Sequence, residues 1–311
     1  MSHPERFPLL IVGTGAMACL FGTRLSPFAQ VTMLGTWREG LAALQGEGIR
    51  LEDDGVSRAA PVRATSDPAE CVGARHALVL VKSWQTERAA RQLQQCLAPD
   101  GVALTLQNGL GNRERLIQAL GPERVAQGVT TWGVTLLGPA HARVGGEGLT
   151  YIGTHPRLAP LVGLLGEAGF ALEEVGDVEG LAWGKVVVNA AINPITALLH
   201  IPNGSLLSAD RSGAWRVAAE AAAEAAAVAA ARGVSLPFGE SEGYVADVAR
   251  RTAANRSSML QDVERGRPTE IDAICGAVVA EGERLGVDTP VNRVLWDLVR
   301  SLAPQPDGGE G

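Results

Sequence analysis

Three polar residues stand in an otherwise apolar stretch of the second half of the chain. Lys185, Asn189 and Asn193 follow one another at intervals of four residues, among valine, alanine and isoleucine. On a helix this spacing puts all three side chains on one face. A solvent-facing stripe more usually carries Glu, Arg or Gln, so we favour a polar cavity. A lysine there could hydrogen-bond a carbonyl oxygen and then protonate it, while neutral amides orient a hydroxyl or a carboxylate.

A carboxylate offers a second candidate group. Glu270 follows Gly266 and Pro268, which interrupt the helical pattern, and we expect it in the first turn of a new helix with Thr269 as the N-cap. The helix dipole favours an ionised carboxylate at that position, and this preference alone would also explain the residue. Desolvation would lower the pKa of Lys185, and a nearby Glu270 would oppose that change.

A glycine-rich segment near the N-terminus predicts a dinucleotide site. It has the form G-x-G-x-x-A and lies between the apolar strand Pro8–Val12 and a helix over Ala16–Ser26. The first glycine permits the tight turn, and the second lets the backbone approach a pyrophosphate at the helix N-terminus. The alternative is a small-residue turn in an α/β sheet. The residues expected at the cofactor are Gly13, Thr14, Gly15, Ala16, Met17 and Ala18.

The end of the second strand indicates which nicotinamide cofactor is used. No carboxylate directly follows the strand Gln30–Leu34, although NAD-binding proteins usually carry one there. Thr36 could donate a hydrogen bond to a 2′-phosphate, Arg38 could pair with it, and Glu39 comes too late to bind a ribose. The sequence therefore favours NADP (NADPH).

Two further strand ends should lie at the same edge of the sheet, because ligands bind at the carboxyl ends of parallel strands. Lys82 follows the strand His76–Val81, and Asn108 follows the strand Val102–Leu106. We expect both at the cofactor, and we include Val134 among the cofactor contacts. Lys82 taken alone could equally be a solvated surface lysine, and Asn108-Gly109 alone could be a turn.

The strands and helices that carry these side chains are predicted to form two domains. Strands alternating with helices, such as Thr86–Leu97 after the strand His76–Val81, predict a parallel α/β sheet with a turn at Pro99–Gly101. Antiparallel strands or a β-rich sheet edge are expected around Gly138–Tyr151, followed by one more helix at Leu158–Ala168. Past about Gly176 the pattern is helical throughout. The helices predicted there are Val178–Ala191, Ala214–Ala231, Tyr244–Glu264, Glu270–Leu285 and Val291–Leu302.

The predicted fold is thus an α/β Rossmann-type N-terminal domain, residues 1–176, followed by an all-α substrate and catalytic domain, residues 177–311. Pro194 should break or kink its helix, since proline lacks an N–H. The alanine-rich segment Val217–Ala231 is either an interface helix, as in a homodimer, or an internal helix, which we favour. The Pro/Gly-rich tail from Pro304 is expected to be disordered.

Composition and residue spacing argue against several classes of protein. A net charge of −7 argues against nucleic acid as the main partner. No apolar run is long enough to predict a transmembrane helix, and the N-terminus lacks the parts of a signal peptide. The four cysteines form no C-x-x-C pair and the five histidines have no ligand spacing, so we expect free thiols in a reducing cytoplasm and no metal.

Several motifs together resemble the ketopantoate reductase (2-dehydropantoate 2-reductase) family. They span nearly the whole chain, and the segments around Lys185 and Glu270 are far more specific than the glycine loop. The motifs are GTGAMA at 13–18, VKSWQT at 81–86, QNGLG at 107–111, WGKVVVNAAINPITAL at 183–198, PNG at 202–204 and SSMLQDVERGRPTEID at 257–272.

The resemblance implies an NADPH-dependent enzyme that reduces ketopantoate to pantoate, a step towards pantothenate and coenzyme A. It implies that Lys185 is the proton donor, that Lys82 contacts the cofactor and that Glu270 closes the site. Asn108 would bridge cofactor and substrate. The implied substrate-binding residues are Asn108, Lys185, Asn189, Asn193, Asn203, Ser258 and Glu270.

Two other functions fit the same residues less well. A related NAD(P)-dependent reductase of another 2-oxo acid, or another β-hydroxyacid or opine-type dehydrogenase, would share the two-domain plan. A non-catalytic NADP-binding regulator would be expected to lack the Lys, Asn and Glu set, which is present here.

Overall fold

The computed structural model describes residues 6–302, and the chain separates into two compact units. Unit 1 comprises the residues up to Gln107 together with Asn112–Val178. Unit 2 comprises Asn108–Gly111 and the residues from Glu179 onward. A four-residue loop from the first half of the sequence therefore belongs to the second unit. The tail from Pro304 lies outside the described residues.

Unit 1 is built on an eight-stranded sheet in the order β12-β11-β8-β7-β6-β1-β2-β5. The strands from β8 to β5 are parallel, β11 is antiparallel to β8, and β12 is parallel to β11. This confirms the expected Rossmann-type sheet. The strands are β1 (Phe7–Val12), β2 (Ala29–Leu34), β5 (Arg63–Thr65), β6 (Ala74–Val79), β7 (Leu97–Thr105), β8 (Val125–Thr130), β11 (Leu149–Gly153) and β12 (Ala171–Val175).

A second, four-stranded sheet in unit 1 has the order β4-β3-β10-β9. Its strands are β3 (Ile49–Asp53), β4 (Val56–Ala60), β9 (Gly133–Gly138) and β10 (His141–Gly146). The antiparallel pairing of β9 with β10 agrees with the β-rich pattern expected there, whereas the sequence analysis did not identify β3 and β4.

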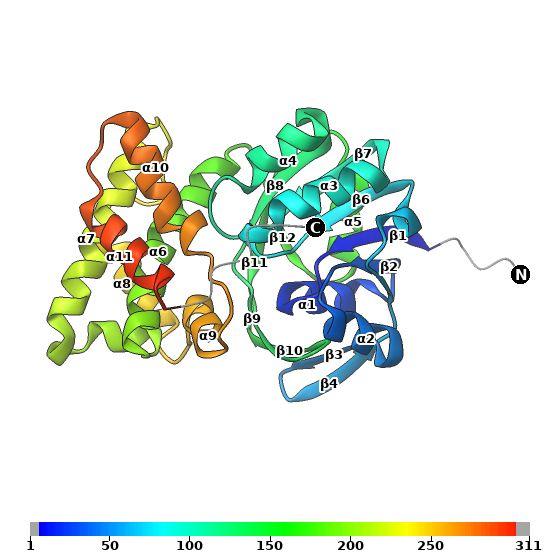
Figure 1. Ribbon diagram of the computed structural model, residues 1–311, viewed down its shortest axis with the longest axis horizontal. Helices are drawn as coiled ribbons and strands as arrows, with labels where there is room; N and C mark the ends of the chain where they lie inside the picture. The colour runs from blue at the N-terminus through cyan, green and yellow to red at the C-terminus, as the bar shows by residue number, and fades with distance from the viewer. Residues whose placement is uncertain (1–5, 303–311) are drawn as a thin grey trace, which may run out of the picture. The chain divides into compact units, whose positions relative to one another are not determined.

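The side chains of β1 show why this strand is apolar throughout. Leu9 and Ile11 pack into one core cluster with residues of α1 (Ala16–Leu25) and α5 (Ala159–Glu167). Leu10 and Val12 pack into a second cluster with residues of α3 (Thr86–Cys96) and α4 (Asn112–Leu120). Successive side chains of a strand face opposite sides, so a strand buried on both faces needs no polar positions. Figure 1 shows α3 and α4 together beside β7 and β8, and α1 near β2; α2 covers Arg38–Glu47.

The turn expected at Pro99–Gly101 does not end a strand, because these residues lie within β7. Strand β7 includes these residues, but its register with β6 jumps from the pair Ala74–Leu97 to the pair His76–Val102. The extra residues form an irregularity within a continuing strand, which is how a bulge absorbs a local turn signal.

Unit 2 is helical, and no strand occurs among its described residues. The prediction of one helix over Tyr244–Glu264 is wrong, because this stretch contains two helices, α8 (Ser241–Arg251) and α9 (Ser258–Glu264). The six-helix set also includes α6 (Val178–Leu199), α7 (Ser212–Ala231), α10 (Cys275–Leu285) and α11 (Pro290–Arg300).

The break between α8 and α9 has a physical cause. The carbonyls of Ala253 and Asn255 accept hydrogen bonds from the backbone N–H groups of Gly204 and Asn203, so they are not used in a helix. Ser257 then caps α9, because its hydroxyl accepts the Leu260 N–H at 3.1 Å. The sequence keeps a helical periodicity across this segment, but its backbone carbonyls bind the 203–204 loop and not a helix of their own.

Pro194 does not break its helix, which was one of its two expected effects, and a kink stays a prediction. Helix α6 continues to Leu199, with Pro194 inside it. A proline cannot donate to the carbonyl four residues earlier, here that of Ala190. The buried thiol of Cys275, at the start of α10, takes this place, with Sγ 4.0 Å from the Ala190 oxygen. A weak donor from another helix thus contacts the carbonyl that Pro194 cannot serve.

The alanine-rich helix α7 has one buried face, which includes Ala218, Ala221, Ala222 and Ala225 and lies in the core of unit 2. Its opposite face, with Val217, Ala223 and Ala227, is exposed. The buried face fits the internal helix that we favour, and a role of the exposed face in a homodimer stays a prediction.

Helix α6 is long and apolar enough to cross a membrane by length and composition alone, but 78% of its most apolar window is buried inside the protein. This burial is typical of a core helix. All four cysteines are free and buried, and no cluster of three or more His, Cys, Asp or Glu side chains suited to a metal ion occurs within residues 6–302.

Candidate active site

The glycine loop of unit 1 is shaped by close backbone contacts. Gly13 donates its N–H to the Leu34 carbonyl at 2.8 Å and has a φ of +136°. A Cβ at this position would lie 3.0 Å from the Leu80 carbonyl, so only glycine fits between the ends of β2 and β6.

Gly15 has the opposite surroundings. It precedes α1 as the N-cap, no side chain caps this helix, and a Cβ would meet nothing within 4 Å. No side-chain cap therefore serves the first N–H groups of α1, and a side chain on Gly15 does not obstruct them, which is the arrangement that a pyrophosphate requires. The predicted loop residues Gly13–Ala18 thus fit a dinucleotide phosphate.

The segment after β2 lies against this loop. A Cβ on Gly35 would lie 2.7 Å from the Thr14 side chain, so the two segments are in contact. Thr36 is exposed, and Arg38 is the exposed first residue of α2. Their place beside the glycine loop suits contact with the 2′-phosphate end of a cofactor.

A polar network joins the ends of β6 and β7, where Lys82 and Asn108 were predicted. The Gln107 amide donates to the Val81 carbonyl at 3.0 Å and to the Thr86 hydroxyl at 2.8 Å. The Lys82 N–H donates to the Gln85 side chain at 3.3 Å, which orders the turn. Gln107 and Thr86 were not among the predicted site residues, although both stand in quoted motifs, QNGLG and VKSWQT.

Val134, the remaining cofactor prediction, lies in β9 opposite Val144 and packs against the first core cluster of unit 1. The structure gives it a packing role in the second sheet, and a cofactor contact for it stays a prediction.

The polar stripe of unit 2 lies on one helix, as the spacing predicts. Lys185 and Asn189 are partly buried on α6, and Asn193 is 7% exposed. Desolvation by burial lowers the pKa of Lys185 to about 8, and the charge of Glu270 opposes this shift. A lysine in this range is mostly protonated at neutral pH and gives up its proton far more readily than an exposed lysine.

Glu270 is buried, with 5% of its surface exposed, and the Asn108 amide donates to its Oε2 at 3.3 Å. These residues are 162 positions apart in the sequence. The loop Asn108–Gly111 makes the contact possible, because Leu110 N–H also donates to the Ala273 carbonyl at 2.8 Å. Glu270 therefore interacts within unit 2 with both of the other predicted residues, Asn108 and Lys185.

The helix predicted to begin at Glu270 is wrong. Glu270 precedes a 3-10 turn over Ile271–Ala273, and α10 begins only at Cys275. Ile274 has a non-helical backbone (φ −105°, ψ −92°), which separates the two segments. The Thr269 hydroxyl does accept the Ile271 N–H, at 3.4 Å, so the expected cap serves the 3-10 turn.

Two more predicted substrate residues flank the turn between α8 and α9. Asn203 is buried, its amide nitrogen donates to the Thr252 hydroxyl at 3.0 Å, and its Oδ1 has no partner among the described residues. Ser258 is exposed at the first position of α9. Next to it, the buried Ser257 hydroxyl lies 2.8 Å from the hydroxyl of Thr196 on α6.

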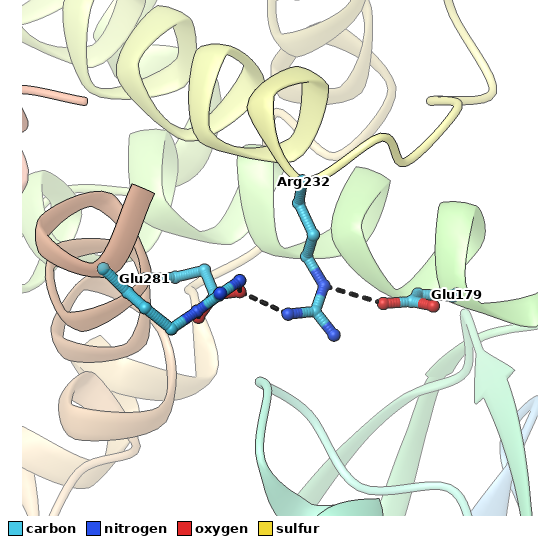
Figure 2. Close-up of polar contacts among 4 residues, drawn as sticks. Glu179, Arg232 and Glu281 are labelled. Carbon is cyan, nitrogen blue, oxygen red and sulfur yellow. Dashed lines mark hydrogen bonds and ion pairs between the residues drawn. The ribbon is translucent and has the colours of Figure 1, made fainter. Parts of the chain in front are cut away.

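Ion pairs fix the first turn of α6, which precedes the polar stripe. Figure 2 shows Arg232, at the end of α7, between Glu179 of α6 and Glu281 of α10. The Arg232 Nε–Glu179 Oε1 distance is 2.9 Å, and Arg284 adds a two-pronged contact to Glu281. Hydrogen bonds from the two arginines lower the pKa of Glu281 to about 2. The network joins three helices of unit 2 at one point.

Comparison with known proteins gives one consistent result. Residues 9–157 match the family described as ketopantoate reductase PanE/ApbA, and residues 177–303 match its C-terminal counterpart. A 2-dehydropantoate 2-reductase of Archaeoglobus fulgidus is 38% identical over 94% of this chain and 96% of its own length. One from Halobacterium salinarum is 36% identical over 94% of this chain and 97% of its own.

Solved structures agree in fold. A PanE/ApbA family ketopantoate reductase from Ralstonia eutropha JMP134 has a TM-score of 0.88 at 33% identity, covering 95% of this chain and 98% of that one. A D-mandelate dehydrogenase, solved with NADH and anilino(oxo)acetate, also has a TM-score of 0.88, at 25% identity over 95% of this chain and 97% of that one.

Proposed function

This chain belongs to the ketopantoate reductase family, and from that membership we propose that it catalyses the NADPH-dependent reduction of 2-dehydropantoate to pantoate. The stripe Lys185-Asn189-Asn193 beside Glu270, with the pKa of its lysine lowered to about 8, is the observation that carries the proposal. Similarity to curated 2-dehydropantoate 2-reductases over 94% of the chain supports the same reaction.

The glycine loop would hold the cofactor pyrophosphate, since Gly15 leaves the N-terminus of α1 open. Thr36 and Arg38 would contact the 2′-phosphate, with Lys82 and Asn108 towards the ribose and nicotinamide. NADPH, when bound, supplies a hydride to the ketone carbon of the substrate.

Lys185 would donate a hydrogen bond from its ammonium group to the ketone oxygen. As that oxygen becomes an alkoxide, the interaction strengthens, and the ammonium proton passes to it. The product is an alcohol and Lys185 is left as a neutral amine, which regains a proton from water. Burial of Lys185 favours this transfer, because it destabilises the charged form of the lysine.

Glu270 would limit that effect, since its negative charge keeps Lys185 protonated before the reaction. The Asn108 amide, already donating to Glu270, is placed to contact the substrate as well. Asn189, Asn193, Asn203 and Ser258 would bind the substrate, and Asn203 Oδ1 is an acceptor suited to a substrate hydroxyl.

The test is NADPH consumption with 2-dehydropantoate and a panel of other 2-oxo acids, including aromatic ones. We expect 2-dehydropantoate to give the highest kcat/KM. A higher value with an aromatic 2-oxo acid would favour the second candidate, a 2-hydroxyacid dehydrogenase like the D-mandelate enzyme of similar fold. NADPH binding without turnover of any acid would instead indicate a regulator.

Because the four cysteines are free and buried, we also propose that the enzyme works in the reducing cytoplasm.

A further inference from the structure

Two segments of unit 2 that carry proposed substrate-binding residues are connected by a buried pair of hydroxyls. Thr196 lies on α6, three residues after Asn193, and its side chain is fully buried. Its Oγ1 lies 2.8 Å from Ser257 Oγ, and Ser257 is itself 5% exposed. The two residues are 61 positions apart in the sequence.

Each end of this contact is held in place. Thr196 Oγ1 also lies 2.9 Å from the Ile192 carbonyl and 3.1 Å from the Asn193 carbonyl, so it is tied to the turn that carries Asn193. Ser257 Oγ accepts the Leu260 N–H at 3.1 Å, so it is tied to the first turn of α9, where Ser258 stands. A movement of one segment therefore strains a hydrogen bond of the other.

The helix is also less restrained at this point. Pro194 cannot donate to the Ala190 carbonyl, and the thiol of Cys275 is a weak substitute. The part of α6 after Pro194 therefore depends more on side-chain contacts than a regular helix does. A buried hydrogen bond between side chains should contribute most to the position of a helix where one of its backbone hydrogen bonds is missing.

We infer that Thr196 is a positioning residue for substrate, acting through Ser257 to fix Ser258 relative to Asn193. The inference rests on the proposed function, in which Asn193 and Ser258 bind the 2-oxo acid. Because such binding contributes equally in the ground and transition states, a loss of positioning should appear in KM and leave kcat nearly unchanged.

The first arm of the test is kinetic. Thr196→Val removes the hydroxyl at nearly constant shape, and we expect KM for 2-dehydropantoate to rise about three- to tenfold, the effect of one hydrogen bond. We expect kcat to change by less than about twofold and the NADPH Kd to stay constant. Thr196→Ser keeps the hydroxyl and should restore KM, which a purely packing role of the methyl group would not allow.

The matched control lies in unit 1. Thr130 and Thr150 form another buried hydroxyl pair at 3.0 Å, and Thr150 is fully buried like Thr196. Thr150→Val should lower the thermal stability to a similar extent but leave KM unchanged. Should Thr196→Val fail to fold, Ser257→Gly serves in its place, since glycine is tolerated as an N-cap and lacks the hydroxyl.

The second arm needs no substrate, so it separates this inference from the proposed function. Hydrogen–deuterium exchange of the unliganded protein should be faster over residues 257–264 in Thr196→Val, but not in Thr196→Ser or Thr150→Val. If the wild type reduces no 2-oxo acid, the proposed function fails and the exchange result alone decides the link. Unchanged exchange over 257–264, or a fall in kcat with KM constant, would overturn the inference.

Discussion

At the scale of single residues, Lys185 carries the strongest prediction. Its ammonium meets a partial charge on the ketone but nearly a full charge on the forming alkoxide, so its interaction grows along the reaction. We expect Lys185→Ala to lower kcat by at least about 10³-fold while the NADPH Kd changes little. Lys185→Arg should not restore the rate, because a guanidinium does not release its proton near neutral pH.

The companion variant for Lys185 is Asn193→Ala, which should act mainly through KM. Steady-state kinetics and a cofactor titration of the three variants would distinguish the two roles. Retention of more than about a tenth of the wild-type kcat in Lys185→Ala would mean that another group, such as Glu270 or a water molecule, donates the proton.

The pKa of Lys185 predicts a pH profile. Reduction needs the protonated lysine, so kcat/KM, which reports ionisations of the free enzyme, should be high below pH 8 and fall as the pH rises through about 8. Because Glu270 raises the pKa of Lys185, Glu270→Gln should move this fall to lower pH. The measurement is kcat/KM for 2-dehydropantoate against pH for both proteins. A profile that is flat up to pH 10 would show that Lys185 does not titrate in the rate-limiting step.

Arg38 tests the cofactor assignment. It is exposed at the start of α2, beside the segment that contacts the glycine loop. Loss of a charged hydrogen bond to a 2′-phosphate should raise KM for NADPH about tenfold in Arg38→Ala. NADH lacks this phosphate, so its KM is the internal control and should not move. An equal rise in KM for NADPH and for NADH would show that Arg38 does not contact the 2′-phosphate.

At the scale of elements, the proline in α6 gives a thermodynamic prediction. Pro194→Ala supplies an N–H to the Ala190 carbonyl, whose oxygen lies 4.0 Å from the Cys275 Sγ in the wild type. The stabilisation from Pro194→Ala should therefore be larger in a Cys275→Ala background, by roughly 0.5–1 kcal/mol. Urea unfolding of the four proteins in this cycle measures the coupling. Strict additivity would show that the thiol does not serve this carbonyl.

Individual elements also show which parts of the structure can be predicted from local sequence patterns. Strands β1, β2 and β6 and the stripe on α6 follow from local periodicity, because each is set by residues two to eight positions apart. Ser257 and Ser258 illustrate the limit: the helical pattern continued into them, but the residues before them pair with Asn203 and Gly204 instead. The Asn108–Glu270 contact was likewise out of reach, because no local pattern reports a contact over 162 residues.

At the scale of the whole molecule, the loop Asn108–Gly111 makes a specific stability prediction. Gly109 has a φ of +81°, and a Cβ there would lie 2.6 Å from the Ala273 carbonyl oxygen. Gly55, in the turn between β3 and β4, has a φ of +76° and no atom within 4 Å of such a Cβ.

Both glycines pay the same conformational cost when replaced, so Gly55→Ala is the matched control for Gly109→Ala. We expect Gly55→Ala to lower the free energy of unfolding by about 1–2 kcal/mol. Gly109→Ala should cost roughly 1–3 kcal/mol more, because it also forces Ala273 to move. Denaturant unfolding of both variants gives the comparison, and equal losses would contradict the close contact with Ala273.

The position of that loop also limits how this protein can be recombined. Unit 2 is assembled from two stretches of sequence, Asn108–Gly111 and the residues from Glu179 onward. A chimaera of two relatives joined once, at the boundary after Val178, would set the loop of one parent against Glu270 and Ala273 of the other. Only a design with additional crossovers on either side of the loop inherits unit 2 whole, so the two halves of the gene are not independent modules.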